Sequence, residues 1–263
     1  MSLEKSEAVI LRMFNWSESS RTVLFFSREH GKLPLVDRGG RSLKSKRGRL
    51  QPFARMQLTF YSSRKESSGY ISDVEIVEAF PLDKEGTLGR LAYGSAACEL
   101  LYLLLPEKEA HQDLYSYLLS YFRKLSEIDK KFLPALFLAF FLRSMSLLGY
   151  HPSLGYCSGC RKEVGRFEKN DAKQMFSPER GGIVCPSCQK AGERYIGLSA
   201  DGLRLLSSLQ QASLPEAAVV PIGFQEATNL VETLAEFLRF HSGLVSELKA
   251  LEFLEKLRSS QPG

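Results

Sequence analysis

The sequence predicts an α+β protein of more than one domain, in which an N-terminal five-stranded OB-fold β-barrel precedes an α-helical domain with an inserted four-cysteine zinc module. Three observations indicate this fold class. The first eighty residues contain five short β-rich runs, helical periodicity begins after Pro81, and two Cys-x-x-Cys pairs interrupt the helical part. At 263 residues, the chain is long enough for each part to bury a core.

Each expected strand is rich in β-branched and aromatic residues and is bounded by turn residues. The five runs are residues 8–13, 22–26, 32–36, 55–61 and 71–80. In the fourth run, Met56, Leu58 and Phe60 alternate with polar neighbours, as a half-buried strand requires. Five strands without a long helix are typical of a small closed barrel, and the OB-fold is the common five-stranded form that binds nucleic acid. We therefore expect this domain over residues 1–81.

The expected helical domain spans residues 82–263. Its helices are predicted at residues 88–105, 114–125, 132–148, 200–211, 225–240 and 244–257. Apolar residues recur there every three or four positions over broad faces, which predicts helices packed as a bundle. Pro106 and Gly149 stop the first and third helices, and Ser199 is placed to cap the fourth.

No membrane segment is expected. The longest apolar run, residues 132–142, is shorter than the roughly 20 residues that a bilayer span needs. The first residues are acidic and lack the apolar core of a signal peptide. Both observations indicate a cytoplasmic location.

Two tight cysteine pairs, Cys157 with Cys160 and Cys185 with Cys188, are separated by 24 residues. Such turns bring sulfurs close enough to share one Zn²⁺ ion, which takes tetrahedral thiolate ligands at about 2.3 Å. Four cysteines leave no position for water, so we expect one structural zinc ion per chain, in a module over residues 155–195. Disulfides or free thiols are the alternative, but disulfides suit a secreted chain.

The fifth cysteine, Cys98, lies in an apolar run and is expected to be a buried core thiol.

Positive charge is concentrated in one segment. Between Arg21 and Lys65, twelve basic residues stand against two acidic ones, a local net charge of +10 in a chain that carries +5 in total. A local excess favours a polyanion-binding surface, and solvated loop charges are the alternative. The expected DNA-binding residues are Lys32, Arg38, Arg41, Lys44, Lys46, Arg47 and Arg49.

Aromatic residues accompany the basic segment and have two interpretations. Exposed rings stack on bases in nucleic-acid sites, whereas buried rings fill the barrel. We expect most of Phe25, Phe53 and Phe60 to lie inside the barrel, so charge should dominate the affinity.

The sequence contains no catalytic motif. Its four histidines occur singly, and it has no nucleophile elbow, P-loop or glycine-rich dinucleotide motif. We expect the protein not to be an enzyme.

A series of short motifs runs along the chain. They are Ala8-Val-Ile-Leu-Arg12 with Glu18, Phe26-Ser-Arg-Glu-His-Gly-Lys32, Val36-Asp-Arg-Gly-Gly-Arg41 with Lys44-Ser45, Leu50-Gln-Pro-Phe53, Glu99-Leu-Leu101, Leu147-Leu-Gly-Tyr-His-Pro-Ser-Leu154, Ser177-Pro-Glu-Arg-Gly-Gly-Ile-Val-Cys185 and Leu251-Glu-Phe-Leu254. In this order and spacing, the chain resembles the RecO family of bacterial recombinational DNA-repair mediators. Asp37 and the richly basic residues 39–48 depart from the family pattern.

The resemblance implies an OB-fold, a helical domain and a zinc module, in a protein of the bacterial cytoplasm and nucleoid. It also implies binding to single- and double-stranded DNA and annealing of complementary strands. With RecR, such a protein helps to load the RecA recombinase onto DNA coated by single-stranded DNA-binding protein (SSB), and RecF is a further candidate partner in this RecF pathway.

The acidic tail of SSB, with its apolar tip, calls for an apolar pocket with a basic rim. Arg123, Lys124 and Arg143 are candidates for the rim, and solvated helix charges are an equally good interpretation of them.

Two other functions fit the residues. An RNA-binding accessory factor would use the same barrel and zinc module, reading RNA through stacking and the 2′-hydroxyl. A zinc-stabilised adaptor would use its basic face to bind an acidic protein. Strand annealing with and without SSB distinguishes the three functions.

Overall fold

The computed structural model describes residues 2–15, 20–38, 50–62, 69–82, 88–166, 173–243, 249, 250 and 252. The chain forms two compact units. The first comprises Met1–Glu127 and Leu248–Gly263, and the second comprises Ile128–Glu247. The expected domain boundary after residue 81 stays a prediction, since the first two helices share a unit with the strands.

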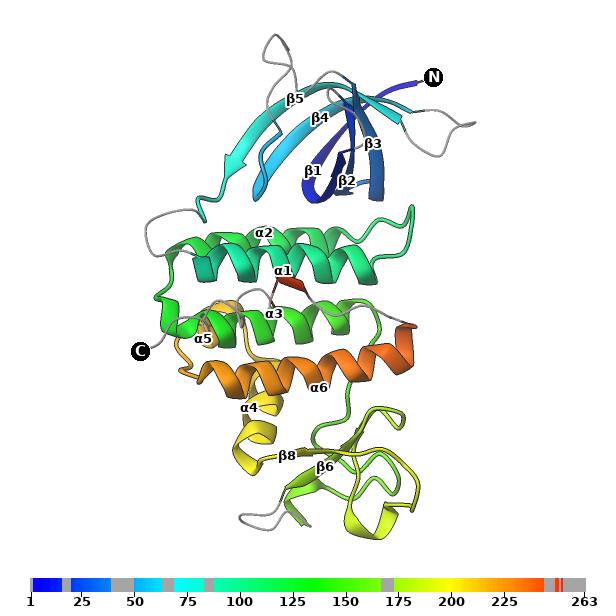
Figure 1. Ribbon diagram of the computed structural model, residues 1–263, viewed down its shortest axis with the longest axis vertical. Helices are drawn as coiled ribbons and strands as arrows, with labels where there is room; N and C mark the ends of the chain where they lie inside the picture. The colour runs from blue at the N-terminus through cyan, green and yellow to red at the C-terminus, as the bar shows by residue number, and fades with distance from the viewer. Residues whose placement is uncertain are drawn as a thin grey trace. The chain divides into compact units, whose positions relative to one another are not determined.

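The strands of the first unit close into a barrel (Figure 1). They are β1 (Ser2–Asn15), β2 (Ser20–Ser27), β3 (Gly31–Arg38), β4 (Ala54–Ser62) and β5 (Gly69–Ala79), joined in the order β1-β2-β3-β5-β4. Only the β3–β5 pair is parallel among these strands; the others, including β1 with β4, are antiparallel. This confirms the predicted five-stranded barrel of the OB-fold type.

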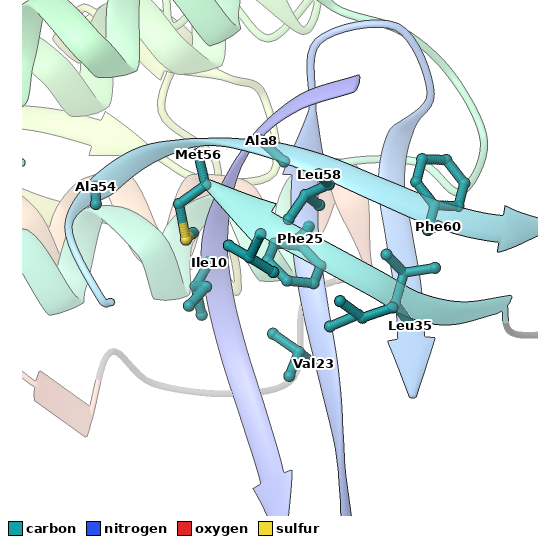
Figure 2. Close-up of a cluster of buried hydrophobic side chains, with 11 residues drawn as sticks. Ala8, Ile10, Val23, Phe25, Leu35, Ala54, Met56, Leu58 and Phe60 are labelled. Carbon is teal, nitrogen blue, oxygen red and sulfur yellow. The ribbon is translucent and has the colours of Figure 1, made fainter. Parts of the chain in front are cut away.

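Buried side chains from all five strands fill the barrel, as Figure 2 shows for β1 to β4. Ala54, Met56, Leu58 and Phe60 point inward from β4 and are almost wholly buried. Phe25 also lies inside, as expected. Phe53 does not belong to this core.

Phe53 adopts a left-handed φ of 52° just before β4 and packs on α2, where its ring lies 5.7 Å from that of Phe122. Most of the three rings lie inside the barrel, as expected, and Phe53 is the exception. The turn conformation aims it away from the barrel, which no periodicity could indicate.

Two helices cover part of the barrel's outer surface. They are α1 (Leu88–Leu104) and α2 (Gln112–Glu127), and α1 packs against β1. Phe26 of β2 meets Tyr115 of α2 edge to face at 5.5 Å. Cys98 of α1 is buried, and burial raises the pKa of its thiol to about 12, as expected of a core thiol.

The second unit is built around a buried helix. It is α3 (Leu133–Leu147), against which α4 (Ala200–Gln211), α5 (Leu214–Ala217) and α6 (Phe224–Ser242) pack. The N-cap of α4 is Ser199, whose hydroxyl accepts from the Gly202 N–H at 2.9 Å, as predicted.

The cysteine segment interrupts these helices with short elements. A small antiparallel sheet has the order β7 (Gly182–Ile183), β6 (Gln174–Ser177) and β8 (Ile196–Leu198). The described residues of this unit also form 3₁₀ turns at Lys130–Phe132, Val164–Arg166 and Pro186–Cys188.

The helix predicted at residues 244–257 lies almost wholly outside the described residues. Within this range the structure describes residues 249, 250 and 252, and these are helical. Within the part of the chain that the structure describes, no helix combines the length and the apolar character that crossing a bilayer requires.

Candidate metal centre and nucleic-acid interface

Two tight turns carry the four cysteines. In the first, the Arg161 N–H donates to the Cys157 carbonyl at 2.9 Å, and Arg161 takes a left-handed φ of 61°. In the second, the Cys188 N–H donates to the Cys185 carbonyl at 2.9 Å as the chain enters its 3₁₀ turn. Each turn folds a cysteine back over its partner.

The ligand atoms of these cysteines form one cluster, with all four sulfurs within 4.8 Å of one another. The Sγ atoms of Cys160 and Cys185 are 3.8 Å apart. A tetrahedron with metal–sulfur distances of about 2.3 Å has edges of about 3.8 Å, so this separation fits a tetrahedral ion. The four cysteines that the sequence singled out are thus brought together and could hold a metal ion.

Backbone amides prepare one sulfur for ionisation. The N–H groups of Cys185 and Gly159 donate to Cys157 Sγ at 3.3 Å and 3.4 Å. Burial disfavours the Cys157 thiolate, but these backbone hydrogen bonds lower its pKa to about 6.

Cys185 and Cys188 resist ionisation, because the pKa of each thiol is raised. Hydrogen bonding to Cys185 and Cys160 raises the pKa of Cys188 to about 12. Four thiolates so close would need a shared cation, which a thiolate-binding metal would supply, with release of protons on binding.

An ion-pair network supports the second turn. The Arg180 guanidinium donates to the Cys188 carbonyl at 2.9 Å and to Glu193 at 2.6 Å. Glu193 also accepts a hydrogen bond from the Tyr195 hydroxyl at 2.5 Å. The Tyr195 hydroxyl oxygen in turn accepts from the Lys190 N–H. Sequence reasoning missed these supporting residues, because nothing in their spacing marks them.

On the barrel, the two described DNA-binding candidates share one face of β3. Leu33, Leu35 and Asp37 point inward or are buried, so Lys32 and Arg38 project outward. Six residues of strand separate the two cations, a span of about 20 Å at 3.3 Å per residue.

Lys32 is the more enclosed of the two. Its Nζ lies 5.4 Å from the centre of the Tyr102 ring, and burial lowers its pKa while Glu107 opposes the shift. Arg38 is exposed, with Cζ 3.7 Å from the centre of the Tyr70 ring. Both are cation–π contacts, which hold the side chains without neutralising their charge.

A neighbouring cluster escaped the sequence analysis. Arg12 of β1 places Cζ 4.9 Å from the ring centres of both Phe14 and Tyr102, and the Phe14 side chain is 40% exposed. Arg12 follows a β-bulge at Leu11. The bulge turns Arg12 outward, whereas strict alternation would place it beside Ile10 in the core.

Other basic residues of the segment are paired with acids. Arg21 binds Asp37 at 2.9 Å, Arg28 approaches Glu7 at 3.9 Å, and Arg55 lies within 4 Å of Glu7 and Glu78. The candidates Arg41, Lys44, Lys46, Arg47 and Arg49 lie outside the described residues.

Comparison with known proteins resolves the family. Residues 1–80 match the model described as "Recombination protein O N terminal", and residues 85–252 match "Recombination protein O C terminal". The chain belongs to the recombination protein O (RecO) family.

Several curated relatives are named DNA repair protein RecO. The one from Symbiobacterium thermophilum is 32% identical over 99% of this chain and 100% of its own length. Those from Pelotomaculum thermopropionicum and Anaeromyxobacter dehalogenans are 29% and 30% identical, over 100% and 96% of this chain and 98% and 96% of their own lengths.

One departure from the RecO pattern has a structural explanation. Asp37 is 3% exposed and faces Arg21 directly across the β2–β3 ladder. The buried carboxylate is therefore charge-compensated by a cross-strand partner. Asp37 thus neutralises one cation of the basic segment and leaves the outward face of β3 unchanged.

The sequence analysis named Arg123, Lys124 and Arg143 as candidates for the basic rim of a pocket that binds the SSB tail. Arg123 of α2 forms a two-pronged ion pair with Glu78, with both N–O distances 2.7 Å, which raises the pKa of Arg123. A ligand would compete with this pair for Arg123. The roles of Lys124 and Arg143 stay predictions.

Proposed function

We propose that this chain is a non-enzymatic mediator of DNA repair and homologous recombination in the cytoplasm and nucleoid. It binds single- and double-stranded DNA and anneals complementary strands. With RecR, it helps to load RecA onto single-stranded DNA coated by SSB, whose acidic tail it contacts, and RecF is a further candidate partner. Membership of the RecO family and the names of the relatives support this function.

The observation that carries the DNA-binding proposal is the outward row of cations on the barrel. Lys32 and Arg38 project from one face of β3, and Arg12 adjoins Lys32 around the Tyr102 ring. Arg38 leads directly into the basic residues 39–49. Phosphates bind to such a row, and the rings of Phe14 and Tyr102 offer surfaces on which bases can stack.

In this proposal the two predicted domains have different roles. Residues 1–81 contact DNA, and residues 82–263 form the helical domain that the module at 155–195 stabilises. One zinc ion held by Cys157, Cys160, Cys185 and Cys188 would cross-link the module without an open coordination position. Its role is structural, because a segment of this size has little core of its own.

Strand annealing tests the proposed function. Purified zinc-containing protein should accelerate the pairing of complementary DNA strands, both naked and coated with SSB, above the rate of the uncatalysed reaction. Matched RNA strands serve as the comparison. Acceleration of RNA pairing alone would favour an RNA-binding accessory factor, and no acceleration of either would contradict the proposal.

A further inference from the structure

A pocket of about 410 Å³ lies in the second unit beside the cysteine cluster. Four segments meet there: the chain after α3, the first cysteine turn, the turn before β7, and the last turns of α6. Its volume is within the range of small-molecule sites, about 300–1,000 Å³. We call it the α6 pocket.

The walls of the α6 pocket are basic. Arg161, Arg180, His151 and His241 line it, and none of its ten lining residues, all within the described ranges, is acidic. Arg180 is held by Glu193 and the Cys188 carbonyl. Its charge is therefore already paired with the Glu193 carboxylate.

Arg161 is differently placed. It is exposed, and no ion pair or hydrogen bond of its guanidinium is found among the described residues. Its left-handed backbone, with φ of 61°, is costly for a long side chain. This cation is therefore available to a ligand in the α6 pocket.

Neutral donors accompany the cations. Ser158 Oγ is shielded from solvent and has no hydrogen-bond partner among the described atoms. A Cβ on Gly182 would lie 2.7 Å from that oxygen, so the glycine preserves the space around it. His151 Nδ1 forms a hydrogen bond with Ser146 Oγ at 3.0 Å, and His241 Nε2 donates to the Pro178 carbonyl at 2.9 Å. Each imidazole is thus oriented at the wall.

We propose that the α6 pocket binds a phosphate group of the nucleic-acid backbone, which makes it a second contact apart from the barrel face. The Arg161 guanidinium and the Ser158 hydroxyl supply donors for the acceptor oxygens of a phosphate, and His151 can add one through Nε2 when its Nδ1 accepts from Ser146 Oγ. No acidic side chain among the described lining residues would face a bound anion directly. This inference rests on the proposed DNA-binding function.

Two single substitutions of equal charge test it. Arg161→Asn removes the cation, and asparagine tolerates the left-handed conformation, so the turn should persist. Lys162→Gln removes the same charge from the next, exposed residue, which does not line the pocket. The full-length zinc-containing proteins are compared in binding a short single-stranded oligonucleotide at several salt concentrations, after their metal contents are shown to be equal.

Arg161→Asn should make the slope of log K against log salt less negative by about 0.7, the effect of one phosphate contact on a single strand. Lys162→Gln should leave the slope unchanged. An unchanged slope in Arg161→Asn, or an equal change in both variants, would overturn this inference but not the proposed function. Wild-type protein that binds no oligonucleotide would instead overturn the proposed function.

Ring resonances of His151 and His241 in NMR spectra identify the source of the ligand. They should shift with the oligonucleotide at lower concentration than with inorganic phosphate, and should fail to shift in Arg161→Asn. Shifts with inorganic phosphate alone, or with an oligoglutamate peptide in place of either phosphate probe, would overturn binding of the nucleic-acid backbone.

Discussion

Lys32 and Arg38 project from the same side of one strand, yet their surroundings make them differently available to phosphate groups. Lys32 lies against Tyr102, and its partial burial lowers its pKa and leaves its ammonium less accessible to a ligand. Arg38 is exposed, and its guanidinium lies over the Tyr70 ring. A stacked guanidinium keeps donors at its edge for phosphate oxygens, which an ammonium cannot do equally well.

Individual residues also mark where sequence reasoning succeeds and fails. Cys157 and its three partners were identifiable because metal ligation demands a spacing that is visible in one dimension. Arg12 was not, because a one-residue bulge decides its direction. The pairing of Arg21 with Asp37 depends on strand register, which charge counting ignores.

Gly31 gives a prediction at this scale. It has a φ of +64°, and a Cβ there would lie 1.9 Å from the Glu109 carbonyl oxygen. Gly31→Ala should lower the free energy of unfolding by about 2–4 kcal/mol, because left-handed strain and a clash with backbone add together. Urea unfolding followed by circular dichroism measures the loss.

Gly192→Ala is its matched control. Gly192 has a φ of +84°, and a Cβ there would meet nothing within 4 Å, so only the conformational strain applies, about 1 kcal/mol. If Gly31→Ala lost no more stability than Gly192→Ala, the close approach of Gly31 to the Glu109 backbone would be wrong.

Among the secondary-structure elements, those with long periodic patterns were predictable. All five barrel strands and the helices α1, α2, α3, α4 and α6 lie where periodicity and stop signals indicated. The four-residue α5 and the strands β6, β7 and β8 were not predicted individually, because runs of two to four residues carry no measurable period. β6 and β7 lie between the two cysteine turns, and β8 and α5 follow the second turn.

The cysteine module gives the prediction at this scale. Cys185→Ser should reduce bound zinc from one ion per chain to none and speed hydrogen exchange of the β6, β7 and β8 amides. The reason is that metal binding provides folding free energy which this small sheet does not supply itself. Metal analysis and hydrogen-exchange mass spectrometry measure both effects.

Cys98→Ala tests whether the effect belongs to the cluster. Cys98 is a buried core thiol outside the metal centre, so this variant should keep its zinc even if its stability falls. Zinc retained in full by Cys185→Ser would refute the four-cysteine site.

For the whole molecule, the distribution of charge matters more than its total. The basic segment carries +10 within a chain of +5, but acids hold Arg21, Arg28 and Arg55. On the described barrel surface, Arg12, Lys32 and Arg38 each contact an aromatic ring. The sequence could indicate the excess of charge, whereas only the fold separates structural ion pairs from candidate ligand-binding residues.

The most direct test of this account is the salt dependence of single-stranded DNA binding, measured by fluorescence anisotropy for two double variants. Lys32→Gln with Arg38→Gln removes both outward charges of β3, and Lys32→Arg with Arg38→Lys keeps them. We predict a slope of log K against log salt that is less negative by about 1.4 in the glutamine variant and unchanged in the charge-conserving one. A wild-type slope in the glutamine variant would contradict the claim that this face of the barrel binds the DNA backbone.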